Sequence, residues 1–352
     1  MKIPVLVPVS ESHREAAQRL FDNKTKPLGS LGLLEAVASQ LCAIQQRVPP
    51  RVERRHILLF AADHGIVEEG VSLYPQVVTA QMVANFAAGG AAINVLARQF
   101  GATLEIVDVG VTGSTLGLAL DRKIRAGTRS FLQEAAMSVG ETQQAIEVGR
   151  ERVEAAVRSG IDLLALGEMG IGNTASAAAL LSLLTGRPAE ETVGRGTGLD
   201  DAQLAHKREV IARSVAFHTA QQATTPFEML CAVGGLEIAA LVGAMLAAAS
   251  QRIPILIDGF ICTVAALAAV GLAPNVRGYM LFAHRSAEQA HALALETLGA
   301  EPLLDLGMRL GEGSGAALAF PLVEASVRLL REMASFESAG VSTASIPLEG
   351  QD

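Results

Sequence analysis

One glutamate stands among three glycines late in the chain, in the run Gly311-Glu312-Gly313-Ser314-Gly315. Glycines leave the neighbouring backbone free of side chains, so a substrate can approach the carboxyl group closely. We expect this run near the start of a helix, where the helix dipole favours an ionised carboxylate and therefore a proton acceptor. A helix cap is the alternative, although a cap does not need three glycines. Glu312 is therefore a candidate general base.

A second glycine-rich run, at residues 167–175, follows an apolar segment and contains Gly170, Gly172, Asn173 and Thr174. The glycines allow backbone N–H groups to approach an anion, and the two polar side chains add donors at a helix N-terminus. This combination predicts a phosphate site. A plain strand-to-helix turn, capped by Asn or Thr, is the alternative.

The spacing Gly170-x-Gly172-x-x-Ala175 also fits a dinucleotide fingerprint. A dehydrogenase is nevertheless a poorer interpretation, because Glu190 and Glu191 follow in a loop where the fold would need an acidic residue ending a strand. No GxxxxGK[ST] motif is present, which excludes a P-loop NTPase at the level of motifs.

A third flexible run, Gly194-Arg195-Gly196-Thr197-Gly198, precedes a helical pattern that Asp200 or Asp201 is suited to cap. Arg195 and, inside that helix, Lys207 are candidates for holding a phosphate or carboxylate group. For Lys207 the alternative is an ordinary solvated helix face.

Two histidines, His64 and His284, stand at the ends of apolar runs and could bind a metal together with Asp63 and Asp258. No HxxxH, HExxH or His/Cys cluster accompanies them, so histidines with satisfied hydrogen bonds are the favoured interpretation. We predict no metal and no cofactor.

The elements that must position these residues are short apolar runs alternating with helical segments. Each run is continuous in hydrophobicity, which is typical of parallel strands buried on both faces. Polar and glycine residues collect where the runs end, and in open α/β sheets ligands bind at that edge. The sequence therefore predicts an α/β fold with a mostly parallel sheet of about six strands, at residues 57–61, 104–109, 161–166, 255–257, 279–282 and 303–306.

Both ends of the chain lack strand patterns. We expect residues 1–50 together with 312–352 to form a small helical lobe, beside an α/β domain at 51–311 that carries the active site. The most apolar windows, 238–249 and 261–272, are shorter than the roughly 20 residues that span a bilayer and predict buried helices.

Composition excludes several classes of partner. Lys and Arg number 28 against 36 Asp and Glu, so the net charge is −8 and no basic field exists for nucleic acid or anionic membranes. The three cysteines form no CxxC pair and are odd in number, which indicates free thiols. No secretion signal is visible at the N-terminus, so we expect a cytoplasmic protein.

Several motifs occur together in one order along residues 24–330, and as a set they resemble the nicotinate-nucleotide–dimethylbenzimidazole phosphoribosyltransferase family. They are Gly29-Ser30-Leu31-Gly32, Ala62-Asp63-His64-Gly65-Ile66, Glu69-Gly70-Val71-Ser72, the run 167–174, Val233-Gly234-Gly235-Leu236-Glu237, Asp258-Gly259-Phe260, His284-x-Ser286-Ala287-Glu288 and, most specifically, 308–315.

The resemblance implies a Rossmann-like sheet with a small helical lobe, in a homodimer, and an enzyme of cobalamin biosynthesis. The reaction it implies replaces the nicotinate of nicotinate mononucleotide by 5,6-dimethylbenzimidazole, which yields α-ribazole 5′-phosphate. The family's base falls on Glu312, and Glu168 is the candidate for stabilising positive charge on the ribose.

The resemblance also assigns the substrate contacts. The phosphate falls at Gly170, Gly172, Asn173, Thr174 and Lys207, the nicotinate near Arg195 and Gly196, and the acceptor ring against Leu310, Tyr74 and Met82 with Gln81 close by. A non-catalytic nucleotide-binding sensor and, third, an NAD-dependent dehydrogenase remain the alternatives.

Overall fold

The computed structural model describes residues 4–196 and 198–342. A parallel sheet of six strands, in the order β3-β2-β1-β4-β5-β6, lies at its centre. The order reverses between β1 and β4, so the chain builds outward from these two strands in both directions. The strands are β1 (Arg55–Ala62), β2 (Thr103–Gly110), β3 (Leu120–Asp121), β4 (Leu163–Met169), β5 (Ile255–Ile257) and β6 (Met280–Phe282).

Helices and 3₁₀ turns, joined by loops, make up most of the remaining described chain. They are α1 (Glu11–Asp22), α2 (Leu33–Gln45), α3 (Val77–Ala88), α4 (Ala92–Gln99), α5 (Val139–Arg158), α6 (Asn173–Thr185), α7 (Ala189–Thr192), α8 (Asp201–Ala220), α9 (Pro226–Val233), α10 (Leu236–Ser250), α11 (Phe260–Leu272), α12 (His291–Thr297), α13 (Ser314–Glu332) and α14 (Phe336–Ala339), with 3₁₀ turns η1 (Gly65–Glu69) and η2 (Pro274–Tyr279).

The predicted α/β class is confirmed, and five of the six predicted strands form. The prediction of a strand at 303–306 was wrong. Leu304 makes a single bridge to His284 beyond the end of β6, and Leu306 is exposed, so the run is not buried on two faces as a parallel strand would be. The sixth strand is β3, whose two residues pair with β2 and are too few to produce a pattern in the sequence.

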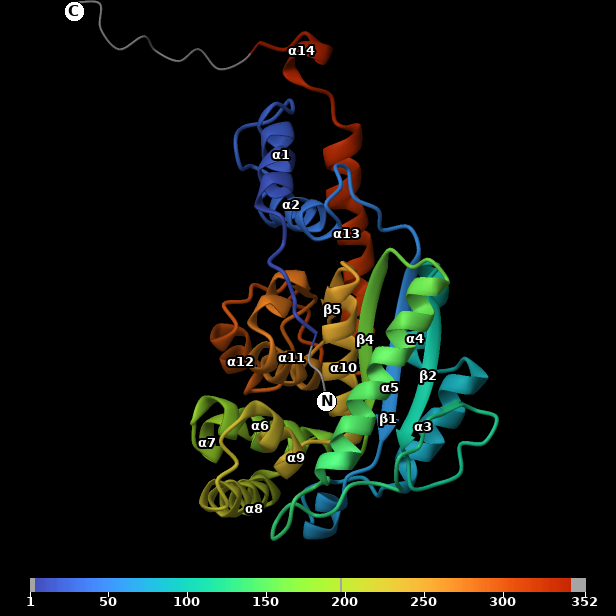
Figure 1. Ribbon diagram of the computed structural model, residues 1–352, viewed down its shortest axis with the longest axis vertical. Helices are drawn as coiled ribbons and strands as arrows, with labels where there is room; N and C mark the ends of the chain where they lie inside the picture. The colour runs from blue at the N-terminus through green and yellow to red at the C-terminus, as the bar shows by residue number, and fades with distance from the viewer. Residues whose placement is uncertain (1–3, 197, 343–352) are drawn as a thin grey trace, which may run out of the picture.

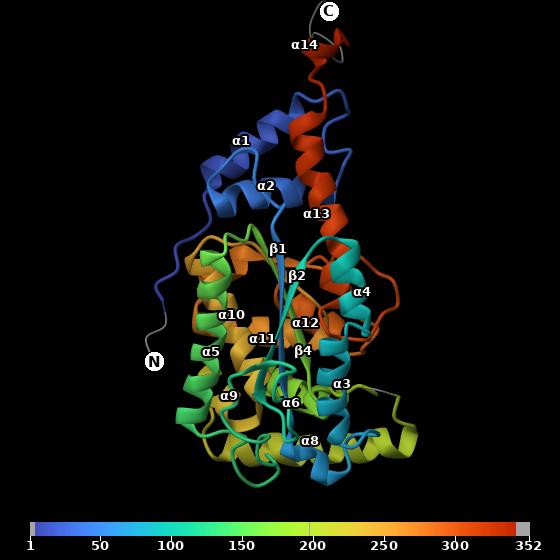
Figure 2. The ribbon, with the colours of Figure 1, turned by 90° about the vertical axis from the view of Figure 1, so that its right-hand side faces the viewer.

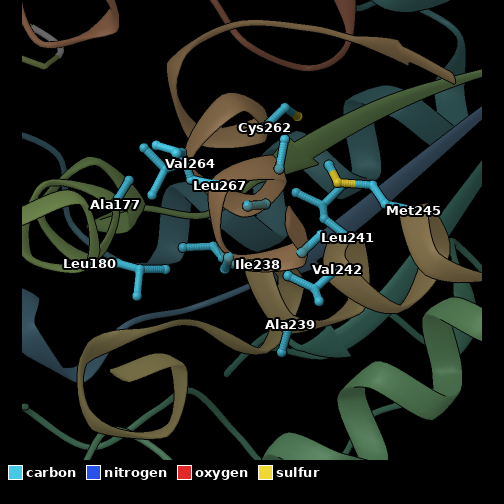
Figure 3. Close-up of a cluster of buried hydrophobic side chains, with 14 of the residues drawn as sticks. Ala177, Leu180, Ile238, Ala239, Leu241, Val242, Met245, Cys262, Val264 and Leu267 are labelled. Atoms are coloured by element: carbon cyan, nitrogen blue, oxygen red, sulfur yellow. The ribbon is translucent and has the colours of Figure 1, made fainter. Parts of the chain in front are cut away.

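The strands are mainly apolar because a separate core covers each face of the sheet. In β1, Leu58 and Phe60 belong to the core under α5 and α10, whereas Ile57 and Leu59 belong to the core under α3, α4 and α13. Figure 2 shows these two groups of helices on opposite sides of the strands. A close-up of the first core shows Leu180, Ile238 and Leu267, from α6, α10 and α11, gathered in one cluster (Figure 3).

The two apolar windows of the sequence are α10 and α11, which are almost entirely buried, as predicted. A third stretch, Val77–Gln99, is the one helical segment in the described part of the chain that is long and apolar enough by composition to cross a membrane. It is divided into α3 and α4, with Gly89 in a left-handed conformation between them.

The N-terminal helices α1 and α2 pack against the end of α13 through Phe21, Cys42 and Leu330 (Figure 1). A buried ion pair joins Lys26 to Glu35 at 2.8 Å in the same group of helices. The first half of α13 packs into the core of the sheet. The division into a lobe (1–50 with 312–352) and a sheet domain (51–311) stays a prediction, and its residues 1–3 and 343–352 lie outside the described part of the chain.

Candidate active site

A cavity of about 480 Å³ opens where β4, β5 and β6 end, beside the point at which the strand order reverses. Its lining comes from α3 and the segment before it, the end of β4 and the turn that follows, the loop before α8, the segments after β5 and β6 and the segment before α13. The lining residues are Tyr74, Val78, Met82, Glu168, Met169, Gly170, Ile171, Asn173, Thr174, Gly196, Gly259, Phe260, Ile261, His284, Ser286, Glu288, Arg309, Leu310, Gly311 and Glu312.

Nine of the thirteen residues predicted for the site line this cavity: Glu168, Gly170, Asn173, Thr174, Gly196, Tyr74, Met82, Leu310 and Glu312. The other four are Gly172, Arg195, Lys207 and Gln81.

Lys207 is buried at 1% exposure, so the alternative of a solvated helix face is wrong. Its Nζ donates a hydrogen bond to Thr174 Oγ1 at 3.0 Å. A Cβ placed on Gly196 would stand 3.4 Å from the same Nζ, so the second and third glycine runs meet at this ammonium group. Burial lowers the pKa of Lys207 to about 8, against the opposing charge of Glu288.

Three of the residues predicted to contact the substrate, Gly172, Arg195 and Gln81, have other surroundings in the structure. Gly172 is the N-cap of α6 at φ 96°, and a Cβ there would stand 2.6 Å from Val67 Cγ2, so this glycine is needed for packing as well as for the turn. Arg195 turns back on its own loop, where it donates to the carbonyl of Leu199 at 2.8 Å and pairs with Asp201. Gln81 is exposed on α3.

Glu312 stands in a left-handed turn. The φ angles of Gly311, Glu312 and Gly313 are 84°, 64° and 80°, and a glutamate held at such a φ is uncommon and often marks a functional site. The flanking glycines therefore allow the left-handed turn to form, and they also leave the carboxyl group accessible to a substrate. A Cβ on Gly311 would stand 2.6 Å from Glu168 Oε1, which puts the second carboxyl group against the same turn.

Asp258, which follows β5, anchors this turn to the sheet. Its two carboxylate oxygens accept hydrogen bonds from the N–H of Gly313 at 3.1 Å and of Ala316 at 2.8 Å, at the start of α13. Asp258 thus takes the favourable position at the helix N-terminus that the sequence analysis had expected for Glu312.

Burial, and not the helix dipole, decides the charge of the two glutamates in the free protein. It raises the pKa of Glu312 to about 7, with the N–H of Ile93 opposing and the charge of Asp258 adding to the rise. The pKa of Glu168 rises to about 8 because burial is joined by the neighbouring carboxylates of Asp258, Glu237 and Glu312. Such values suit groups that exchange protons near neutral pH.

The comparisons with known proteins agree with this site. A phosphoribosyltransferase family matches residues 6–341. A nicotinate-nucleotide–dimethylbenzimidazole phosphoribosyltransferase of Desulforudis audaxviator is 51% identical over 339 residues, which cover 96% of each chain. The protein of the same name from Cupriavidus necator is 50% identical over 348 residues, covering 98% of this chain and all of that one. The chain belongs to this phosphoribosyltransferase family.

A crystal structure named as CobT from Thermus thermophilus superposes with a TM-score of 0.91 at 44% identity, over 95% of this chain and 100% of that one. These findings confirm the resemblance predicted from the motifs. A member of the phosphoribosyltransferase family is an enzyme, a pentosyltransferase, and neither a dehydrogenase nor a non-catalytic nucleotide sensor.

Two residues that were not predicted for the site, Asp258 and His284, belong to it in the structure. In the sequence they were considered as metal ligands or, for His284, as a histidine with satisfied hydrogen bonds, and both also stand in motifs of the family. The signal that could have found them is their position directly after consecutive strands. His284 Nδ1 and Glu288 Oε1 are buried and lack a hydrogen-bond partner within the described residues, although both side chains line the cavity. The expectation of satisfied histidines is confirmed for His64, which bonds through both ring nitrogens, but not for His284.

Proposed function

We propose that this chain transfers the phosphoribosyl group of nicotinate mononucleotide to 5,6-dimethylbenzimidazole. The products are nicotinate and α-ribazole 5′-phosphate, formed with inversion at the anomeric carbon, for the nucleotide loop of cobalamin. One observation carries the proposal: two buried carboxyl groups, of Glu168 and Glu312, share a cavity with a glycine turn to which a buried lysine is bonded. The names of the relatives supply the substrate class.

In the proposed reaction one benzimidazole nitrogen attacks C1′ of the ribose. The bond from C1′ to nicotinate breaks, and its electron pair neutralises the pyridinium, so the leaving group needs no acid. The second benzimidazole nitrogen loses its proton to the carboxylate of Glu312. A base whose pKa is about 7 is well matched to proton transfer at neutral pH.

Glu168 is the proposed stabiliser of positive charge on the ribose as the C1′ bond breaks. With a pKa of about 8 it is mainly protonated at pH 7 in the free protein. A cationic pyridinium in the cavity favours the ionised carboxylate, so we infer that Glu168 becomes ionised when nicotinate mononucleotide binds.

The remaining contacts are proposed from the family's motifs and from the cavity. Gly170, Thr174 and Lys207 receive the phosphate, with Gly172 shaping the turn and Asn173 bonded to Glu168. The acceptor ring lies against the side chains of Tyr74, Met82 and Leu310, with Gln81, which is exposed on α3, close by. Arg195 and Gly196 are proposed for the nicotinate side, which requires the Arg195 guanidinium to leave Asp201.

The proposed function is tested by incubating the protein with nicotinate mononucleotide and dimethylbenzimidazole and following nicotinate release by chromatography. We expect release that depends on both substrates, with a ribazole phosphate of α configuration by NMR. Purines, other benzimidazoles and phenols serve as further acceptors. No release with any acceptor would contradict the proposal.

We also propose that the chain forms a homodimer in the cytoplasm. Large apolar side chains are exposed at the start of α3, at Leu73, Tyr74 and Val77, and Leu116 is exposed in the neighbouring loop. A single chain of 36.6 kDa leaves this surface uncovered. Light scattering is expected to give about twice that mass, and Val77→Asp to lower it, whereas a monomer at micromolar concentration would contradict the dimer.

A further inference from the structure

Two sequence motifs that the proposed reaction does not use, those of His64 and Glu237, meet beneath the turn between β4 and α6. Because this turn is the proposed phosphate site, we call it the phosphate turn. His64, just after β1, and Glu237, in the first turn of α10, are both fully buried. His64 Nε2 lies 2.7 Å from Glu237 Oε1, and His64 Nδ1 lies 3.1 Å from Ser176 Oγ on α6. Ser176 is two residues beyond Thr174 on the same helix. The imidazole therefore connects β1, α6 and α10.

The hydrogen bonds of Ser176 fix the orientation of the ring. Its hydroxyl has one proton, and carbonyl oxygens of Val233 and Gly234 lie 2.8 and 3.1 Å away. A carbonyl can only accept, so the serine donates to this pair and accepts from His64 Nδ1–H. Nε2 then shares one proton with Glu237, and the two ring nitrogens hold the imidazole in a single orientation.

Glycines allow the phosphate turn to pack closely against the imidazole ring of His64. A Cβ on Gly170 would stand 3.3 Å from His64 Nε2, and one on Gly172 would stand 3.1 Å from His64 Cβ. On the opposite side, a Cβ on Gly235 would stand 2.3 Å from His64 Cε1 and 2.6 Å from Glu237 Oε2. The turn between β4 and α6 thus packs directly against the imidazole of His64.

We propose that His64, held by Glu237 and Ser176, is a positioning residue that sets the geometry of the phosphate turn and so the affinity for the nucleotide substrate. The inference rests on the proposed function, because it takes this turn as the phosphate site. None of the three side chains lines the cavity, so they act through the backbone above them. The acceptor pocket at α3 and Leu310 is formed by other residues.

The experiment compares KM for nicotinate mononucleotide with KM for dimethylbenzimidazole in His64→Leu and Glu237→Leu. In both variants we expect the first constant to rise about tenfold or more, as for a lost buried hydrogen bond, and the second to change less than about threefold. His64→Leu keeps the carboxylate of Glu237, which acts on the charge of Glu168, so in this variant kcat is also expected to change less than about threefold. In Glu237→Gln the amide can donate to His64 Nε2, so this conservative variant is expected to restore the wild-type KM within about threefold. Equal effects on both KM values, or none, would overturn the inference.

The matched control is His56→Leu. His56 is a buried histidine near the start of β1, at the opposite end of the strands, and lies 2.7 Å from Thr103 Oγ1. Its loss is expected to leave both KM values unchanged. If His64→Leu does not fold, the KM for nicotinate mononucleotide is measured in Ser176→Ala instead. A threefold higher KM supports the inference, and an unchanged KM overturns it.

Calorimetric Kd values for nicotinate mononucleotide separate the two proposals. Wild-type binding without turnover contradicts the function, and unaltered binding by the variants contradicts the positioning role.

Discussion

Glu312→Gln is expected to lower turnover by roughly 10²-fold to 10⁴-fold, the range for loss of a positioned general base. Glutamine has nearly the same shape and suits the left-handed turn as well as glutamate does, so the hydrogen bonds of Asp258 to the start of α13 remain. Only the ability to take a proton from the acceptor base is removed. Binding of nicotinate mononucleotide, measured by calorimetry, is expected to stay within about threefold of wild type.

The control is Glu301→Gln, which changes an exposed glutamate outside the cavity and is expected to leave turnover within twofold. Unchanged turnover in Glu312→Gln would remove this residue from the mechanism. A large loss of nucleotide affinity in the same variant would show a binding role instead.

The pH profile of the wild type gives a second check on the same residue. Because burial raises the pKa of Glu312 to about 7, its carboxyl group is protonated below that pH and cannot accept a proton. Glu168 must also be ionised, and its pKa is about 8 in the free protein. We therefore expect kcat/KM to begin to fall below pH 8 and to fall more steeply below pH 7, where both carboxyl groups become protonated. An activity that stays constant down to pH 5 would contradict an essential base with a raised pKa.

Lys207→Met is expected to raise KM for nicotinate mononucleotide by roughly 10-fold to 150-fold, since a hydrogen bond from a charged group contributes about 1.5–3 kcal/mol. Methionine fills the same buried space on α8 without the ammonium group that bonds Thr174. The KM for dimethylbenzimidazole is expected to change less than threefold, because the proposed acceptor pocket is formed by other residues, Tyr74, Met82 and Leu310.

Arg213→Met is the matched control, since it removes an exposed cation from the same helix. Thermal unfolding is measured alongside, because the carboxylate of Glu288 loses a neighbouring positive charge in Lys207→Met. Equal increases in both KM values with a lowered Tm would indicate general destabilisation and contradict a phosphate contact.

The chemistry of this protein is largely readable from local sequence, because it depends on short motifs whose glycines have a local purpose. The run around Glu312 needs three successive left-handed or closely packed positions, and residues 167–175 need a sharp turn from a strand into a helix. Five of the six apolar runs likewise form strands, since burial on both faces leaves a continuous hydrophobic signal, although the run at 303–306 carries the same signal and forms none.

Properties that arise between distant segments could not be predicted in this way. Lys207 and Gln81 both stand on helical segments, and only packing buries the first and exposes the second. The link from His64 to Glu237 joins residues 173 positions apart. The charge of Glu312 is the clearest case. Its position among glycines near a helix start predicts an ionised carboxylate. In the structure Asp258 occupies that helix start and the surrounding chain excludes water, so the pKa of Glu312 rises. Residue type and spacing thus sufficed to propose the reacting groups, whereas their protonation and mutual positions follow from desolvation and contacts that exist only once the chain is folded.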